Sequence, residues 1–218
     1  MKAFAAQLGM ELRLMSRRGE NLLVTLVIPL VLLLFFGSTS VFSLGGQRPV
    51  DFLVPGILAL AIMSTGMVSL GIATAYERHY GVLKRLGGSP LTRSQLIAAK
   101  IGSVVAVEIG QAILLLGVAA LAFDWRPTGS AGLPLAIGIL GTVAFAGLGL
   151  LMAGGLRAEA TLAGANGLYL VFALIGGMFL PVDHLPPALS GISPYLPPTA
   201  LADLCLLYTS PSPRDRQK

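Results

Sequence analysis

The sequence predicts an all-α integral membrane protein with five transmembrane helices. Of its 218 residues, 55% are apolar and only 11% are charged, and the mean hydropathy is +0.81. Soluble domains carry about 25% charged residues, so this chain has too few charges to cover the surface of a water-soluble domain. A disulfide scaffold is excluded as well, because Cys205 is the single cysteine.

Each predicted span is a stretch of about 20 mostly apolar residues, the length that a helix needs to cross about 30 Å of hydrocarbon. The first span is not a signal peptide, because its apolar run is too long and no small-residue cleavage site follows it. Pro29 is expected to bend this span. The spans are predicted at residues 21–42, 52–75, 96–123, 133–156 and 160–180.

The loops between these spans differ strongly in positive charge. Ten lysine and arginine residues lie on one side of the predicted membrane, whereas only Arg48 and Arg126 lie on the other. Since positively charged loops stay in the cytoplasm, the amino terminus is predicted to be cytoplasmic. The net charge of +5 forms no exposed basic patch with aromatic residues, so we expect no nucleic-acid partner.

Residues 1–18 predict an amphipathic helix at the membrane surface. Such a helix can lie in the headgroup plane, with its cations near anionic lipid. The alternative is that this segment simply begins the first membrane helix, but Gly19 and the charges around it favour a break. The apolar face at helical spacing consists of Phe4, Leu8, Leu12 and Met15.

The cytoplasmic loop between the second and third spans is the most informative polar segment. It predicts a short helix from Tyr76 to Leu86 that ends at two glycines and is followed by a Ser-Pro turn. Thr92 and Gln95 have the spacing of a capping box that would begin the third span. A stiff, partly apolar helix between two membrane helices is typical of a docking surface for a partner.

The chain carries no motif for catalytic chemistry of its own. It lacks a GxxxxGK[ST] phosphate-binding loop, so we do not expect it to bind and hydrolyse nucleotide by itself. His79 and His184 lie on opposite sides of the predicted membrane and cannot share a metal. We therefore predict neither an enzyme nor a metal site.

Gly149 and Ala153 have the small-xxx-small spacing of closely packed membrane helices.

Three polar residues inside the predicted spans are candidate site residues. Glu108 is the only acid within the spans and Gln111 follows one turn later; an intramembrane carboxylate is a functional hypothesis by default. The sequence leaves open whether they line a substrate path or pack between helices. Asn166 is expected to make an interhelical hydrogen bond.

The segment 182–204 is rich in proline and nearly uncharged. It is too broken by proline to span the membrane, and its apolar residues predict short half-helices that enter the outer leaflet where they pack against protein. The alternative is an exposed loop, which seldom carries this many leucine and isoleucine residues.

Taken in order, these features resemble the membrane subunits of type-2 ABC exporters. An amphipathic segment precedes a span with a mid-helix proline, and the resemblance extends over about residues 1–204. The cytoplasmic loop matches the family pattern at Glu77, Arg78, Gly81, Val82, Leu83, Arg85, Leu86, Pro90, Leu91 and Lys100. The fifth span and the segment after it match at Arg157, Glu159, Ala160, Gly177, Pro181, Leu185, Pro186, Leu196 and Pro197.

The resemblance implies that the loop forms a coupling helix that fits a cleft in a separate ATPase subunit. Two permease chains would work with two ATPases in the plasma membrane of a prokaryote, and ATP and magnesium would be bound by the ATPase, with no cofactor in this chain. Residues 182–204 would form re-entrant helices. Many relatives resemble exporters of drugs or lipid-like compounds, although a fold does not fix a substrate. The implied coupling residues are Glu77, Arg78, Gly81, Val82, Leu83, Lys84, Arg85, Leu86 and Pro90.

The tail departs from the family pattern, which has a sixth span at this point. Residues 205–218 are polar, rich in proline and unable to cross a membrane. This string resembles translated sequencing-adapter read-through, so we expect a non-native tail in place of the sixth span. A natural short tail is the alternative.

Two other functions stay open from the sequence. An ion-coupled secondary transporter or channel would use Glu108 as its ion-coupled group. A non-transporting membrane anchor would use the Tyr76–Leu86 segment only to hold a cytoplasmic partner.

Overall fold

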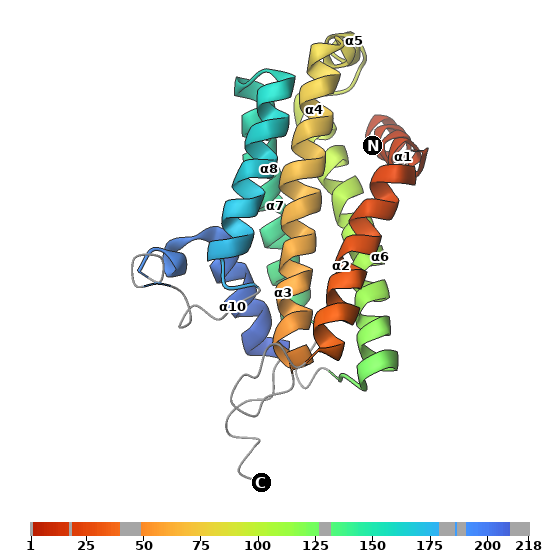
Figure 1. Ribbon diagram of the computed structural model, residues 1–218. Coiled ribbons are helices and arrows are strands. Elements are labelled where there is room, and N and C mark those ends of the chain that lie inside the picture. Colours follow the sequence, from red (N-terminus) through yellow and green to blue (C-terminus); the bar gives the residue numbers. More distant parts are fainter. Residues whose placement is uncertain are drawn as a thin grey trace.

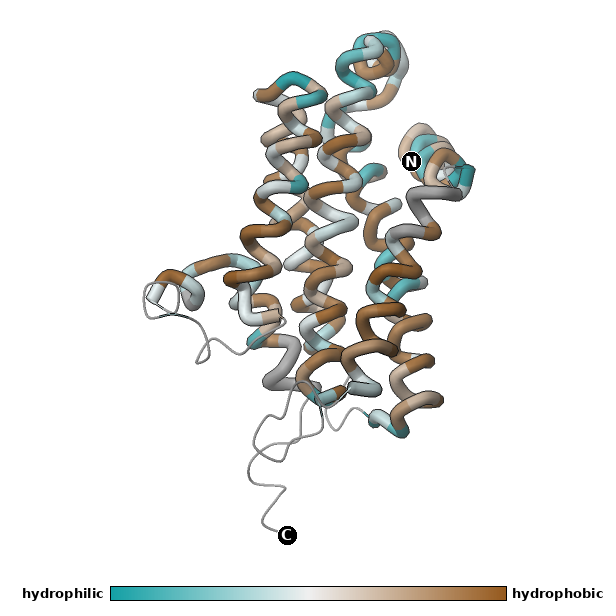
Figure 2. The backbone as a smooth tube through the Cα atoms, viewed as in Figure 1, coloured by the Kyte–Doolittle hydropathy of each residue, from teal (hydrophilic) through white to brown (hydrophobic). Residues whose placement is uncertain are grey.

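The computed structural model describes residues 2–17, 19–39, 49–126, 132–178, 186 and 191–209. Every regular element within these ranges is helical, and four helices are long and apolar enough to cross a membrane. The long helices run side by side in one bundle (Figure 1), and hydrophobic residues follow them along most of their length (Figure 2). The all-helical fold predicted from composition is confirmed.

The helices begin and end close to the predicted boundaries. The break expected near Gly19 stays a prediction, because Gly19 begins α2 and residue 18 lies outside the described residues. The second predicted span is one continuous helix of 31 residues with a π-helical segment in its middle. The elements are α1 (Lys2–Arg17), α2 (Gly19–Ser38), α3 (Pro49–Met63), η1 (Ser64–Ser69), α4 (Leu70–His79), α5 (Val82–Leu86), α6 (Arg93–Phe123), α7 (Gly132–Gly155), α8 (Ala158–Ile175), η3 (Ser193–Tyr195) and α10 (Pro197–Thr209).

The four candidate spans correspond to the second to fifth predicted ones. They are Pro49–His79, Arg93–Phe123, Gly132–Gly155 and Ala158–Ile175. The first predicted span overlaps α2, which has 20 residues, and the part of it that counts among the apolar helices of the described residues is Thr25–Ser38. The count of five spans therefore stays a prediction, as does the predicted topology.

The helix formed by α3, η1 and α4 lies at the centre of the bundle. Its most apolar window is 72% buried, whereas the other three spans are 22–28% buried. Helices α2, α6, α7, α8 and α10 all pack on it. The outer helices expose large apolar side chains such as Leu121, Leu151 and Leu174, as expected of a surface that faces lipid.

Small residues bring α7 very close to the central helix. A Cβ atom on Gly149 would lie 2.5 Å from the carbonyl oxygen of Met67, and one on Gly71 would lie 3.0 Å from Gly149. Ala146 and Ala153 on the same face of α7 are fully buried. This contact agrees with the small-residue packing predicted for Gly149 and Ala153.

The segment after α8 folds back onto the end of the bundle opposite α5 (Figure 1). Here α10 packs against α3 and α7, and Leu201 and Ala202 are buried beside Met178. The Ser193 hydroxyl donates to the carbonyl of Ile175 at 2.6 Å. This segment is thus packed against protein, although its insertion into a leaflet stays a prediction.

The structure describes only some of the residues that were predicted to form re-entrant helices. Pro181 and Leu185 lie outside the described residues, while Pro186 is exposed. Leu196 is half-buried against the core, and Pro197 begins α10. Helix α10 continues to Thr209, past the expected start of the non-native tail at residue 205.

Candidate functional site

Helix α5 projects from the end of the bundle that also carries α1 and the α7–α8 turn (Figure 1). The sequence predicted one helix from Tyr76 to Leu86, but this was wrong, since α4 ends at His79 and α5 begins at Val82. The break occurs because Gly81 has a φ of +72°, a left-handed conformation in which any other residue is strained. No residue of α5 is buried.

Short hydrogen-bonded connections hold α5 between α4 and α6. The Thr92 hydroxyl accepts a hydrogen bond from the Gln95 N–H at 3.2 Å, and the Gln95 side chain accepts one from the Thr92 N–H at 3.1 Å. The predicted capping box is therefore confirmed. Ser89 adds a hydrogen bond from its hydroxyl to the carbonyl of Leu86.

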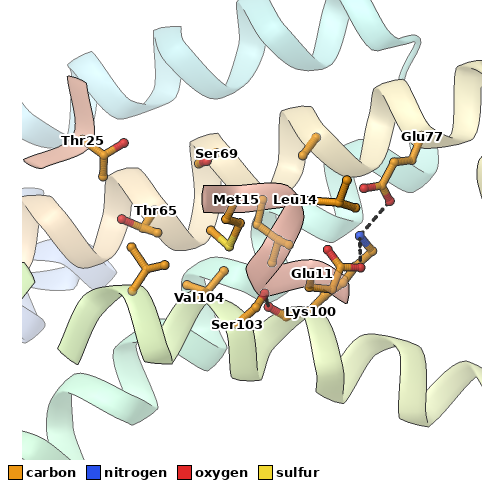
Figure 3. A pocket seen from close by; sticks show the side chains of 13 residues that line it. Glu11, Leu14, Met15, Thr25, Thr65, Ser69, Glu77, Lys100, Ser103 and Val104 are labelled. Atoms are coloured by element: carbon orange, nitrogen blue, oxygen red, sulfur yellow. Dashed lines mark hydrogen bonds and ion pairs between the residues drawn. The ribbon is translucent and has the colours of Figure 1, made fainter. Parts of the chain in front are cut away.

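Glu77 points into the bundle, where it forms part of a buried ion-pair cluster (Figure 3). Its Oε2 lies 2.7 Å from Nζ of Lys100 on α6, and the same ammonium lies 3.0 Å from Oε1 of Glu11 on α1. The Lys100 side chain is only 2% exposed. Because buried charges are tolerated only when they are paired, this cluster fixes α1, α4 and α6 relative to one another.

Arg78 links α4 to a different neighbour. Its guanidinium donates hydrogen bonds to the carbonyl oxygens of Gly154 and Leu156 at the carboxyl-terminal end of α7. A cation there satisfies carbonyls that have no partner within the helix and interacts favourably with the helix dipole. Glu77 and Arg78 thus position α4 directly behind α5, and neither lies on the projecting tip.

A groove of about 500 Å³ separates α1 from α5 and the loop that follows it. Of the predicted coupling residues, Glu77, Val82, Leu86 and Pro90 line this groove. Lys84 and Arg85 are exposed on α5 outside it, and Leu83 is half-buried. The opposite wall belongs to α1 and includes Ala3, Ala6, Met10 and Leu14.

Sequence reasoning missed the part played by Glu11. The predicted apolar face of α1 included Leu12, which is exposed in the structure, whereas Glu11 is buried and accepts a hydrogen bond from the Gln7 side chain at 2.9 Å. The only signal in the sequence is a pair of polar residues one turn apart beside the apolar stripe. That signal has no meaning until Lys100 is known to lie opposite.

Gln111 compensates for the proline in α2. Its Nε2 donates a 2.7 Å hydrogen bond to the carbonyl oxygen of Thr25. Thr25 lies four residues before Pro29, which has no N–H, so this carbonyl has lost its usual donor within the helix. Of the two roles considered for Gln111, the structure shows helix packing.

Glu108 is a buried residue of α6 that faces α7, and it is not among the lining residues of the groove between α1 and α5. It shares a hydrogen bond with the Thr142 hydroxyl of α7, and its exposed fraction is 9%. The other carboxyl oxygen has no hydrogen-bond partner among the described residues.

A second groove, of about 690 Å³, runs along the central helix between α2 and α8. Ile28 and Pro29 line it from α2, and Tyr76 and Ser64 from the central helix, with no charged side chain among the lining residues. Asn166 lines it from α8. Its side chain donates to the Leu162 carbonyl of its own helix at 2.8 Å, so the predicted interhelical bond of Asn166 was wrong.

Within the ranges that the structure describes, no group of three or more His, Cys, Asp or Glu side chains could hold a metal ion. The chemistry of the described site is therefore that of charge pairs, helix ends and two grooves.

Comparison with known proteins agrees with this architecture. The sequence model of the "ABC-2 type transporter" family matches residues 3–205, which is most of the chain. A protein of Bacillus subtilis (strain 168) named "Putative transport permease YvfS" is 28% identical over 199 residues, a match that covers 86% of this chain and 77% of that protein. The chain therefore belongs to the ABC-2 type transporter family of membrane permeases.

Proposed function

We propose that this chain is the permease subunit of an ATP-driven exporter in a prokaryotic plasma membrane. The family match and the similarity to a protein named as a transport permease support transport. The sequence lacks a phosphate-binding loop, so ATP and magnesium would be bound by a separate ATPase subunit. The observation that carries the coupling part of this proposal is the projecting α5.

The ATPase would dock on α5 and in the groove between α1 and α5. Val82 and Leu86 give that groove an apolar wall, and Lys84 and Arg85 add exposed positive charge on the same short helix. A surface of this kind fits an apolar cleft with acidic residues at its rim.

A movement of α5 would be transmitted to the membrane helices through Glu77 and Arg78 of α4. The ion pair of Glu77 with Lys100 connects α4 to α6, and Arg78 connects α4 to the end of α7. A displacement of α5 would therefore move α4, α6 and α7 together. We infer a positioning role for Glu77 and Arg78 in this step.

The groove between α2 and α8 is our candidate for part of the substrate path. Its tyrosine, serine and asparagine side chains, together with the lack of charge, suit an apolar or amphipathic substrate. A second permease chain, the same or different, would cover this groove. This arrangement supports a dimer of permeases.

The two alternatives have less support. An ion-coupled transporter would need Glu108 to meet a path, but Glu108 lines neither groove. A simple anchor would use α5, yet it would need no buried ion pairs that join α4, the helix directly before α5, to α1 and α6.

The double variant Leu83→Asp plus Leu86→Asp tests the docking surface. Two charges on the apolar side of α5 should abolish co-purification of the ATPase, while the permease still inserts into the membrane. Leu156→Asp plus Ala160→Asp is the matched control, because it adds the same charges at the same end of the bundle, in the α7–α8 turn and the first turn of α8. The measurement is the ratio of ATPase to permease after affinity purification from the membrane.

An unchanged ratio in the α5 double variant would show that docking occurs elsewhere. If docking is lost, ATP-dependent uptake into inverted vesicles separates an exporter from an anchor. The exporter requires uptake that needs both ATP and an intact α5.

A further inference from the structure

We infer that Glu108 is a proton-binding site: its carboxyl group is neutral and donates a hydrogen bond to Thr142. This inference concerns the interior of the bundle and does not depend on the proposed function. In this inference the proton stays on Glu108. In the ion-coupled transporter considered above, Glu108 would instead bind and release an ion during transport.

The hydrogen bonds of Thr142 carry the inference. Its hydroxyl oxygen lies 2.9 Å from the carbonyl oxygen of Gly138 and is also within hydrogen-bond distance of Oε2 of Glu108. A threonine hydroxyl has a single hydrogen but two acceptor lone pairs. The Gly138 carbonyl can only accept, and we assign the hydroxyl hydrogen to it. The contact with Glu108 then needs a hydrogen from the carboxyl group.

The surroundings of Glu108 offer no charge that would stabilise a carboxylate. Neither α7 nor η1 contains a titratable residue, while α2 and α3 carry their only acids, Glu20 and Asp51, in their first turns. On α6 the nearest cation is Lys100, about 12 Å away along the helix axis. Its ammonium is already paired with the acids of α1 and α4.

The unpartnered oxygen of Glu108 is consistent with a neutral group. Oε1 is buried and has no donor among the described residues. An unpaired carboxylate oxygen at this depth would be very costly, whereas the carbonyl oxygen of a neutral acid loses much less on burial. The proton therefore resides on Oε2, and Oε1 is the carbonyl oxygen.

A neutral Glu108 completes a closed set of links between three helices. Glu77 joins α4 to α6 through Lys100, Glu108 joins α6 to α7 through Thr142, and Arg78 joins α7 back to α4. These three helices are thereby fixed to one another by polar contacts at two depths. If the proton left Glu108, the Thr142 hydroxyl would have to donate to the carboxylate and would lose its hydrogen bond to the Gly138 carbonyl.

Infrared difference spectroscopy of the full chain in lipid nanodiscs at neutral pH tests the inference. Subtracting the spectrum of Glu108→Gln from that of the unaltered protein isolates this one carboxyl group. We expect the carbonyl stretch of a protonated acid, and we expect Thr142→Val to shift its frequency because the hydrogen-bond acceptor is gone. Glu108→Gln should unfold at the temperature of the unaltered protein, since the amide still donates to Thr142.

The opposite results are equally clear. A difference spectrum that contains the paired bands of a carboxylate would overturn the inference. If the carbonyl stretch of the protonated acid keeps its frequency in Thr142→Val, the hydrogen bond of Glu108 is not made to Thr142. Failure of Glu108→Gln to fold would also contradict it, because the amide preserves the neutral donor.

Discussion

Gln111 and Arg78 each supply hydrogen-bond donors to a neighbouring helix. Gln111 donates to a carbonyl that Pro29 leaves without a donor, and Arg78 donates to the last carbonyls of α7. Within the hydrocarbon core of a membrane, such backbone groups have no water with which to form a hydrogen bond. Both residues were candidate site residues in the sequence. In the structure, Gln111 stabilises a helix that contains a proline, and Arg78 stabilises the end of a helix.

Replacing Gln111 with methionine tests this at the scale of one residue. The substitution keeps a similar side-chain volume but leaves the Thr25 carbonyl without a donor, and we expect a loss of about 1–3 kcal/mol in the free energy of unfolding. Pro29→Ala restores an N–H in α2. In that background the same substitution should cost much less. Chemical unfolding in detergent measures both values, and an equal loss in the two backgrounds would contradict the assigned role.

How well single residues could be predicted depended on the range of their contacts. The capping box of Thr92 and Gln95 was correct because all of its partners lie within one turn. The prediction of an interhelical hydrogen bond for Asn166 was wrong, because its side-chain amide donates to a carbonyl of its own helix one turn away. The role of Glu11 could not be predicted, since Lys100 lies far away in the sequence.

At the scale of elements, the contact between α7 and the π-helical segment determines how closely the bundle packs. The Gly149 backbone lies against the carbonyls of Gly66 and Met67, with no room for a side chain. Packing this close is the main source of helix association in lipid, where apolar side chains gain little by leaving the membrane.

Two glycines on α7 give a matched pair for testing this contact. Gly149→Ala would place a methyl group 2.5 Å from a backbone oxygen, whereas a Cβ atom on Gly147 meets nothing within 4 Å. We expect Gly149→Ala to destabilise the fold by about 1–3 kcal/mol, and Gly147→Ala to leave it unchanged or slightly more stable. Thermal unfolding of the purified proteins measures the difference. Equal effects at both positions would show that α7 does not pack this closely.

The element boundaries show a similar limit of sequence reasoning. The four candidate spans of the structure overlap the second to fifth spans predicted from hydropathy. Hydropathy did not separate α4 from α5, because the break depends on the φ of one glycine. It also did not indicate the π-helical turn between α3 and α4, which has no distinctive composition.

For the whole molecule, the bundle has two chemically different ends. One end carries α1, α5 and the α7–α8 turn, and the other carries α10 and the carboxyl-terminal end of α6 (Figure 1). The positive charges lie mostly at the first end, which is therefore predicted to be cytoplasmic. The coupling and path proposals both depend on this orientation.

Cysteine labelling checks the orientation. Because Cys205 is the single cysteine, Cys205→Ser gives a background without thiols. Arg126→Cys should react with a membrane-impermeant maleimide in intact cells, and Lys84→Cys only after the membrane is permeabilised. Both positions are exposed in the structure. The reverse labelling pattern would invert the topology and exclude α5 as a cytoplasmic docking site.

The sequence by itself determined the membrane class, the helical fold and the family, because these depend on composition, periodicity and local motifs. It also located the capping box that begins α6, whose contacts are short in sequence. Only the tertiary structure decided what Glu77, Lys100 and Gln111 do, since their partners lie on other helices. The same holds for the two grooves, because each is lined by segments that come together only when the bundle packs.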